Sequence, residues 1–258
     1  MRVIVEADYE AVSDWAARHV AEAIAVAAPT SANPFVLGLP TGSTPVGLYD
    51  RLVELNRKGD LSFRHVVTFN MDEYVGLPAN HPAGYHAFMW EHLFGRIDIP
   101  EANVNILDGN TADPQAECTA YEERIARFGG VDLWVGGLGA NGHIAFNEPG
   151  SSLASRTRIV SLSHETILTN ARFFGHDPDQ VPRQALTVGV GTIMDGREVL
   201  VLVSGVSKAH ALQHVLEGSI GDHCPAGAVR THPRSTIVCD KAAAREMDSA
   251  TIERFTNL

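Results

Sequence analysis

The alternation of short apolar runs with longer amphipathic segments is the feature that most limits how this chain can fold. The runs have the length and β-branched content of buried strands, and the segments between them are long enough to form crossover helices. Repeated strand and helix units predict an α/β fold, in which helices cover both faces of a mainly parallel sheet. The expected strands are 2–5, 35–39, 65–69, 131–135, 185–188, 198–203 and 235–238, and the expected helices are 9–27, 45–58, 84–94, 114–128, 207–217 and 241–250.

The organisation of the chain indicates one domain. Its 258 residues are 45% hydrophobic, which is enough to bury a sizeable core. No linker, low-complexity tract or internal repeat divides the chain, so we expect a single domain spanning residues 1–258. Residues 151–182, here named the lid segment, interrupt the rhythm with only a short helical piece at 165–174. This segment is either a lid over a ligand crevice or a plain surface excursion.

Charge and cysteine content restrict the partners and the compartment. The formal net charge of −11 disfavours nonspecific binding to nucleic acid or anionic membranes, although a few cations in a cleft can still hold an anionic small molecule. Cys118, Cys224 and Cys239 are too widely spaced to suggest a disulfide framework or a zinc site. The first residues lack a signal-peptide pattern, and no apolar run reaches membrane-spanning length. We therefore expect a soluble cytoplasmic protein.

The segment 136–150, GGLGANGHIAFNEPG, is the strongest candidate for an active-site loop. It follows an apolar run with the character of a buried strand, and the ligand crevice of an open α/β sheet lies beyond the carboxyl ends of its strands. His143 is the side chain there that is most able to transfer a proton, and Asn141 and Glu148 are close to it in sequence. The alternative is a structural turn with a solvated histidine, but so many glycines and polar residues exceed what a turn needs.

The segment 37–45, LGLPTGSTP, predicts a cradle for an anion. It joins an expected strand to an expected helix, and Pro45 suits the first helical position. Free amides and the positive dipole end at a helix N-terminus favour a phosphate, although an ordinary capped helix start remains the simpler alternative. The sequence is not a Walker A motif. The candidate phosphate-binding residues are Thr41, Gly42, Ser43 and Thr44.

The segment 69–77, FNMDEYVGL, places two acids at the same edge of the sheet. A partly buried carboxylate there has its pKa raised toward the range in which it can both take and return a proton. Adjacent acids on an extended chain point in opposite directions, so one of Asp72 and Glu73 faces the crevice and the other has a structural role. We choose Asp72 as the general base, while a solvated turn or a helix-start acid is the alternative.

Two cations and a histidine pair complete the candidates. Lys208 follows an expected strand and lies in the first turn of an expected helix, where the helix dipole disfavours a cation. An anionic partner would explain its position, and simple surface exposure is an equally good alternative. Arg172 in the lid segment could close over the same anion. His210 and His214 have the spacing of a metal pair on a helix, but no further ligand pattern accompanies them. We expect no metal site.

In four motifs the chain resembles the glucosamine-6-phosphate deaminase family, and the likeness covers essentially its whole length. The motifs are LPTGSTP, VVTFNMDEYVGL, GGLGANGHIAFNEPGSSLASRTR and ALTVGVGTI. The resemblance implies a three-layer αβα, modified Rossmann-like domain. It also implies cofactor-free conversion of glucosamine 6-phosphate and water into fructose 6-phosphate and ammonia, as part of N-acetylglucosamine catabolism.

The resemblance gives the candidate residues their roles. His143, oriented by Asn141 and Glu148, would open the sugar ring, and Asp72 would then carry a proton from C2 to C1. Residues 41–44, Arg172 and Lys208 would hold the phosphate, and binding this remote group would fix the sugar for both proton transfers.

The chain departs from the family pattern at Asn141, where many members carry aspartate. An amide still accepts a hydrogen bond from imidazole, but it lacks the charge that raises histidine basicity. We therefore expect Glu148 to carry more of that task.

A second departure concerns regulation. Allosteric bacterial members bind N-acetylglucosamine 6-phosphate at a subunit interface and form hexamers. A lysine is expected where Val160 stands and a tyrosine where Arg254 stands, so activation and the hexamer are both in doubt for this chain. The positions matching that allosteric site are Ser151, Ser152, Arg158, Ser161 and Arg254.

Four other functions compete with this one. 6-Phosphogluconolactonase shares the fold and a phosphate loop, but MDEY with GHIAFNEP favours the deaminase. A galactosamine-6-phosphate isomerase-deaminase differs only in local pocket contacts that sequence does not reveal. A sugar-phosphate sensor would not need proton-transfer groups at two places. A dinucleotide oxidoreductase is disfavoured because no GxGxxG follows the first strand.

Overall fold

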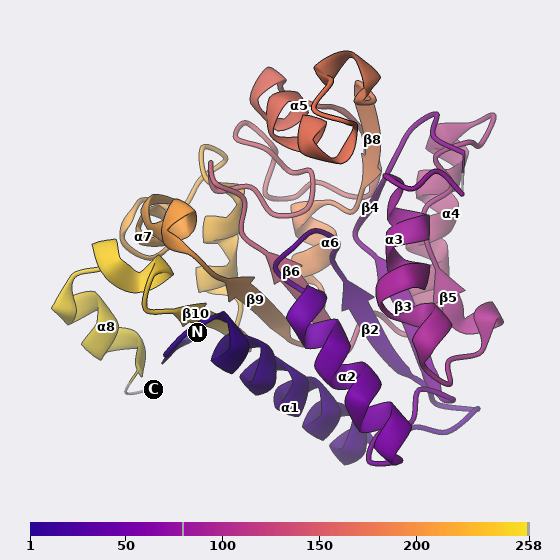
Figure 1. The fold of residues 1–258 in the computed structure, drawn as a ribbon, viewed down its shortest axis with the longest axis horizontal. Coiled ribbons are helices and arrows are strands. Elements are labelled where there is room, and N and C mark those ends of the chain that lie inside the picture. The colour runs from indigo at the N-terminus through magenta and orange to yellow at the C-terminus, as the bar shows by residue number, and fades with distance from the viewer. Residues whose placement is uncertain (79, 257–258) are drawn as a thin grey trace.

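The computed structural model describes residues 1–78 and 80–256, and it is built around a parallel seven-stranded sheet (Figure 1). Every neighbouring pair in this main sheet is parallel. The expected mainly parallel α/β fold is therefore confirmed. In spatial order the strands are β1 (Arg2–Glu6), β10 (Ser235–Asp240), β9 (Val199–Val203), β6 (Leu133–Gly137), β2 (Phe35–Leu39), β3 (Val66–Asn70) and β5 (Val104–Asn105).

Helices cover both faces of the main sheet, as a buried parallel sheet requires. Side chains of alternate strand residues enter two separate cores, so Leu133 and Val135 of β6 lie in one core and Trp134 lies in the other. One face is covered by α1 (Tyr9–Ala27), α2 (Val46–Lys58) and α3 (Tyr85–His92). The opposite face is covered by α4 (Pro114–Arg127), α6 (Val190–Met194), α7 (Ala209–Glu217) and α8 (Ser249–Thr256). Short 3₁₀ turns lie at Phe94–Arg96, Glu101–Asn103, Ala171–Phe173, Pro178–Gln180, Val206–Lys208, Pro225–Thr231 and Ala243–Glu246.

A second, smaller sheet lies above the edge of the main sheet at which β2 ends (Figure 1). Its strands pair antiparallel in the order β4 (Asp72–Tyr74), β8 (Gln184–Thr187) and β7 (Arg158–Ser161). The apolar run expected as strand 185–188 belongs to this sheet and not to the main one. The strand itself is confirmed as β8, and its place in the second sheet was not predicted because a buried antiparallel strand has the same continuous apolar pattern as a buried parallel strand.

The lid segment is more regular than its sequence suggests. It contains β7, helix α5 (His164–Asn170) and the turns at Ala171–Phe173 and Pro178–Gln180. Ser163 caps α5 by accepting a hydrogen bond from the Thr166 amide. Apolar side chains of this segment pack on Tyr74 of β4, so the segment has a core of its own.

Two further expected elements differ from the structure. The expected helix 241–250 is replaced by the turn at Ala243–Glu246, and α8 begins only at Ser249. The carboxylate of Asp240 accepts a hydrogen bond from the Ala243 amide at 2.7 Å, which favours a tight turn directly after β10. The strand expected at 131–135 begins two residues later and runs into its glycines, because Asp132 binds the Val36 amide at 2.8 Å through its side chain.

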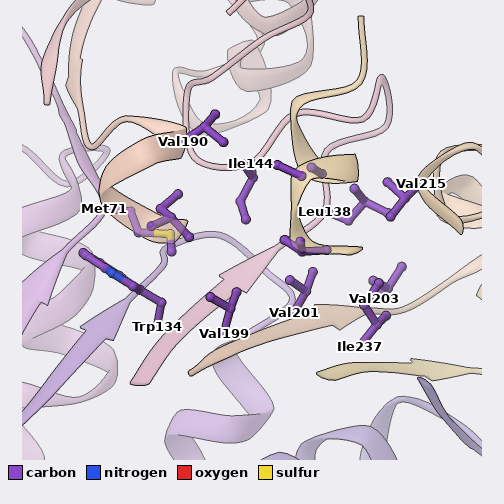
Figure 2. Close-up of a cluster of buried hydrophobic side chains, with 14 of the residues drawn as sticks. Met71, Trp134, Leu138, Ile144, Val190, Val199, Val201, Val203, Val215 and Ile237 are labelled. Atoms are coloured by element: carbon purple, nitrogen blue, oxygen red, sulfur yellow. The ribbon is translucent and has the colours of Figure 1, made fainter. Parts of the chain in front are cut away.

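A hydrophobic cluster joins the main sheet to the segments above it (Figure 2). Trp134 of β6 and Val199 and Val201 of β9 point toward Met71 and Ile144. Met71 and Ile144 are both buried, and they precede Asp72 and follow His143 in the sequence. Close packing of these two side chains therefore fixes the backbone next to both proton-transfer candidates. Among the described residues, no helix is both long and apolar enough to cross a membrane.

Candidate active site

Four loops of the main sheet carry the candidate residues, and they follow four strands that are adjacent in space. The strands are β9, β6, β2 and β3, in that order. Because all four are parallel, their carboxyl ends lie at one edge, where α/β sheets bind ligands. From β2 the chain adds β3 and β5 on one side, and it later adds β6 and β9 on the other side, so the strand order reverses between β2 and β6. The loops are residues 40–45, 71–74, 138–148 and 204–208.

The loop after β2 has the properties of an anion cradle. Pro45 is the N-cap of α2 and provides no side-chain hydrogen bond to the first helical amides. Gly42 has φ of +95°, and a side chain there would meet only open space. A hollow next to this loop is lined by Tyr9, Ser43, Thr44, Val46 and Ser204, so the loops after β2 and β9 share it. Hydroxyl-bearing residues of both loops and the first residue of α2 thus line one hollow, and the Gly47 amide of α2 donates to the Tyr9 hydroxyl at 2.7 Å.

Asp72 begins β4, and one residue separates it from the end of strand β3 of the main sheet. Its side chain is 7% exposed. Burial, and to a smaller extent the neighbouring charge of Glu73, raise the pKa of Asp72 to about 8. A carboxyl group with this pKa is able to accept a proton and also to release it near neutral pH.

Glu73 points the other way and binds backbone. Its carboxylate accepts hydrogen bonds from the amides of Tyr74 (2.8 Å), Tyr85 (3.0 Å) and His86 (2.7 Å). Burial raises the pKa of Glu73, and these three amides act to lower it. Two of the amides belong to the first turn of α3, so Glu73 caps that helix from a distant part of the chain.

His143 and Asn141 form a defined pair in the loop after β6. The Nδ1 atom of His143 lies 2.6 Å from Oδ1 of Asn141, and the backbone amide of His143 donates to the same oxygen at 3.3 Å. The amide needs an acceptor, so it selects the oxygen and not the NH₂ group of Asn141. This arrangement assigns the ring hydrogen to Nδ1 and leaves Nε2 as a proton acceptor.

The surroundings of His143 keep it neutral. Burial and the charge of Lys208 lower its pKa while the charge of Glu148 opposes them, and the resulting pKa is about 4. The ring packs over Gly139, where a Cβ atom would lie 2.2 Å from it. Glycine is therefore required at that position if the imidazole is to keep this orientation.

Glu148 contacts the lid segment and not the imidazole. Its Oε1 atom accepts hydrogen bonds from the Thr166 hydroxyl at 2.5 Å and from the Ser163 amide at 3.3 Å. Asn141 thus orients His143 through a direct hydrogen bond to Nδ1. Glu148 acts on His143 through its charge.

Lys208 and Arg172 are close enough to influence each other. Burial lowers the pKa of Lys208, and the charge of Arg172 lowers it further. Two cations without an intervening acid repel each other, and an anion between them would remove that cost. Lys208 also acts on His143, so the phosphate candidates and the proton-transfer candidates belong to one site.

The residues matching the allosteric site fall in two places. Arg158 donates to Asn147 at 2.8 Å and to Ser151 at 3.2 Å, and burial lowers its pKa. Arg254 lies on α8, which contacts β1 at the opposite edge of the main sheet from β5. Within one chain, Arg254 is therefore separated from Arg158.

The sequence analysis missed two tyrosines beside Asp72. The hydroxyls of Tyr74 and Tyr85 lie 3.5 Å apart, and Tyr74 also accepts a hydrogen bond from Asn170 at 2.8 Å. The signal for Tyr74 was its position two residues after Asp72, which puts both side chains on the same face of a strand. In the described part of the chain, no group of three or more His, Cys, Asp or Glu side chains is placed to hold a metal ion.

Comparison with known proteins identifies the family. Residues 7–238 match the family described as glucosamine-6-phosphate isomerases/6-phosphogluconolactonase. The whole chain is 55% identical to 98% of a Phocaeicola vulgatus protein named glucosamine-6-phosphate deaminase, and 52% identical to 96% of a Borreliella burgdorferi protein of that name. The chain belongs to this family.

Solved structures agree with this assignment. A monomeric glucosamine-6-phosphate deaminase shares 41% identity with a TM-score of 0.91, over 95% of this chain and all of that one. The 6-phosphogluconolactonase of Trypanosoma brucei shares only 22% identity with a TM-score of 0.76, over 96% and 98% of the two chains. The second likeness concerns the fold alone.

Proposed function

We propose that this protein converts glucosamine 6-phosphate and water into fructose 6-phosphate and ammonia. The observation that carries the proposal is that Asp72, a buried carboxyl with a pKa of about 8, and His143, a neutral imidazole, both follow strands that end at one sheet edge. The sequence identity to proteins named glucosamine-6-phosphate deaminase supports the same reaction.

Binding of the substrate's phosphate anchors the sugar in the site. Residues 41–44 offer amides and hydroxyls, and Lys208 and Arg172 offer positive charge. Holding a group remote from the reacting carbons fixes the position of C1 and C2 relative to the proton-transfer groups.

Ring opening is the task of His143. With the hydrogen on Nδ1 bound to Asn141, Nε2 takes the proton of the C1 hydroxyl and returns it to the ring oxygen as the bond between C1 and that oxygen breaks. Glu148 stabilises the positive charge that appears transiently on the imidazole.

Isomerisation and deamination follow. The Asp72 carboxylate removes the proton from C2, and the resulting acid delivers it to C1 of the enolamine. The ketose imine that forms at C2 adds water and loses ammonia, which leaves fructose 6-phosphate. The reaction requires no net oxidation and no added redox cofactor.

The test is an assay with glucosamine 6-phosphate in the absence of added nucleotide and metal, in which ammonia and fructose 6-phosphate are both measured. We expect equal amounts of the two products, and a lack of product would overturn the proposal. The galacto epimer and 6-phosphogluconolactone are run beside it. Faster turnover of either one would move the assignment to that substrate.

We further propose a cytoplasmic location. All three cysteines are buried and none is paired with another, which suits a reducing compartment. Fractionation of the source cells with detection of the protein tests this location.

A further inference from the structure

Helix α1 contacts the loop after β2 through its first residue, Tyr9. The helices α1 and α2 pack side by side on one face of the main sheet (Figure 1). The Asp8 side chain caps α1 by accepting a hydrogen bond from the Ala11 amide at 3.0 Å, which fixes the start of the helix. The hydroxyl of Tyr9 donates to the Ser43 carbonyl at 3.2 Å and accepts from the Gly47 amide at 2.7 Å. One side chain thus connects the loop to the first turn of α2.

The close approach of the two helices depends on a glycine. Gly47 is buried, and a Cβ atom there would lie 2.3 Å from Oγ of Ser13 and 2.9 Å from the Tyr9 hydroxyl. The Ser13 hydroxyl is itself held, because it donates to the Tyr9 carbonyl at 2.9 Å. A side chain at position 47 would displace one of these two hydroxyls. The hydrogen bond from the Gly47 amide to Tyr9 is therefore part of the packing of α1 on α2.

Three backbone amides of the loop have no partner in the protein. Within the described residues, the amides of Gly42, Ser43 and Thr44 donate to no protein group. Pro45, the next residue, has no amide hydrogen, and its side chain does not cap α2. Unpaired amides at a helix N-terminus are the donors that bind a phosphate group. Tyr9 therefore holds the loop by a carbonyl and leaves these donors to a ligand.

Two tyrosine hydroxyls fix the directions of two peptide groups in the loop. Tyr9 binds the Ser43 carbonyl, and the fully buried Tyr49 of α2 donates to the Pro40 carbonyl. A trans peptide group is planar, so its C=O and N–H bonds point in opposite directions, and no peptide bond in the described chain is cis. The bond from Tyr9 to the Ser43 carbonyl therefore directs the Thr44 amide away from the Tyr9 hydroxyl.

We propose that Tyr9 is a positioning residue for the substrate's phosphate, which holds the loop after β2 in its binding conformation before the ligand arrives. The inference rests on the proposed function in placing the phosphate at residues 41–44. Gly42 has φ of +95° and no Cβ, so the peptide groups beside it can rotate at little steric cost unless other contacts hold them. A loop that is already ordered loses less conformational entropy on binding. The Tyr9 hydroxyl has its single hydrogen on Ser43, so it shapes the loop and does not donate to the phosphate.

Titration calorimetry with inorganic phosphate tests this role without requiring turnover. In Tyr9→Phe, which keeps the ring, we expect the Kd for inorganic phosphate to rise about three- to tenfold, the range for one lost hydrogen bond. With glucosamine 6-phosphate as substrate, KM should rise by the same factor and kcat should stay within about twofold, because the phosphate is held equally in the ground state and the transition state. A role in stability alone would lower the free energy of unfolding and leave the Kd unchanged.

Tyr121→Phe is the matched control, because it also removes a single tyrosine hydroxyl. Tyr121 is buried, and its hydroxyl donates to the backbone oxygens of Asn70 and Asn105, outside the loop after β2. We expect this variant to bind inorganic phosphate with the Kd of the unchanged protein, even if its free energy of unfolding falls.

Three results would overturn the role of Tyr9. They are an unchanged or lower Kd in Tyr9→Phe, an equal rise of the Kd in Tyr121→Phe, and a lack of phosphate binding by the unchanged protein. A lower Kd would mean that the Gly47 amide, once released from Tyr9, serves the phosphate better than the held loop does. Phosphate binding that depends on Tyr9 in a protein without deaminase activity would support this inference and overturn only the proposed reaction.

Discussion

At the scale of single residues, burial acts in opposite directions on the two proton-transfer groups. It raises the pKa of Asp72 to about 8 and lowers that of His143 to about 4, because in both cases the charged form is disfavoured. Both groups are therefore neutral in the free protein near pH 7. A neutral imidazole suits ring opening, whereas Asp72 must ionise before it takes a proton from carbon.

The first prediction concerns the titration of Asp72. NMR of labelled aspartate carboxyl groups should show one group titrating near pH 8, and it should be missing in Asp72→Asn. The same variant should lose about 10²- to 10⁴-fold in kcat, the usual contribution of a general base. Because the folded pKa exceeds the ordinary aspartate pKa of 3.8, the stability linked to the protonated carboxyl is fully present below that pH and is lost as pH rises through about 8. An unaltered set of carboxyl titrations in Asp72→Asn would contradict the prediction.

The second prediction concerns Asn141→Asp. Adding a carboxylate 2.6 Å from Nδ1 should raise the pKa of His143 by about 1 unit or more, since an opposite charge at this distance favours the imidazolium. NMR titration of the histidine ring protons measures this shift. Asn110→Asp adds the same charge on an exposed loop away from the ring and is the control. A His143 pKa that stays near 4 in Asn141→Asp would show that the pair does not control the ring.

The third prediction compares the two neighbours of His143. Glu148→Gln should impair ring opening more than Asn141→Ala, because the charge of Glu148 stabilises the imidazolium that forms transiently as His143 carries the proton. Turnover of glucosamine 6-phosphate by the two variants decides between them. Equal losses, or a larger loss in Asn141→Ala, would mean that the direct contact to Nδ1 matters more than the charge.

At the scale of elements, the carboxylate of Glu122 joins α4 to Thr157, near the start of the lid segment, and to Thr192 of α6, which follows it. Glu122 accepts hydrogen bonds from the Thr157 amide at 2.8 Å and from the Thr192 hydroxyl at 2.5 Å, and it pairs with Arg156 at 2.6 Å. The pKa of Glu122 is lowered: burial opposes ionisation, but the bonds from Thr157 and Thr192 and the charge of Arg156 outweigh it.

The fourth prediction is that Glu122→Gln lowers the free energy of unfolding by about 1.5–3 kcal/mol, the range for hydrogen bonds to a charged group. Since its folded pKa lies below the ordinary glutamate pKa of 4.5, the contribution is present above that pH and is lost as pH falls through the folded pKa. Chemical denaturation at neutral pH measures the change, and Thr192→Val, which removes one of the bonds, should cost less. A cost in Thr192→Val as large as that in Glu122→Gln would contradict the role of the charge.

Elements were predictable where local pattern decided them. The helix expected at 9–27 agrees with α1, because Asp8 caps it and its apolar residues recur at helical spacing. β4 is only three residues long, and its pairing with β8 and β7 depends on residues far away in the chain. The order of the site loops could be expected from the strands that precede them. The link from Tyr85 to Asn170 could not, since it depends on how the lid segment packs on β4.

At the scale of the whole molecule, the positions matching the allosteric site lie in two separate places within one chain. Arg158 is on β7 and Arg254 is on α8, and Val160 packs against the cluster around Tyr74 in place of a cation. A shared anion site would therefore need a second subunit, and it would lack the charge of a lysine at residue 160.

The fifth prediction follows from this arrangement. N-acetylglucosamine 6-phosphate should leave the substrate saturation curve unchanged, apart from any competition at the active site. Saturation curves with and without that ligand measure this, and sedimentation velocity on the same samples gives the oligomeric state. A strong shift of the curve to lower substrate concentration would refute the prediction.

The order of the main sheet has a consequence for how this fold can change over evolutionary time. The loops after β9, β6, β2 and β3 lie outside the strand pairs of the main sheet, and the one after β3 also supplies β4 of the second sheet. A lineage can therefore exchange one loop while the rest of the scaffold and its neighbours are inherited intact. The 6-phosphogluconolactonase of Trypanosoma brucei keeps this scaffold at 22% identity. A new activity in such a lineage would then arise by successive changes to single loops at the sheet edge.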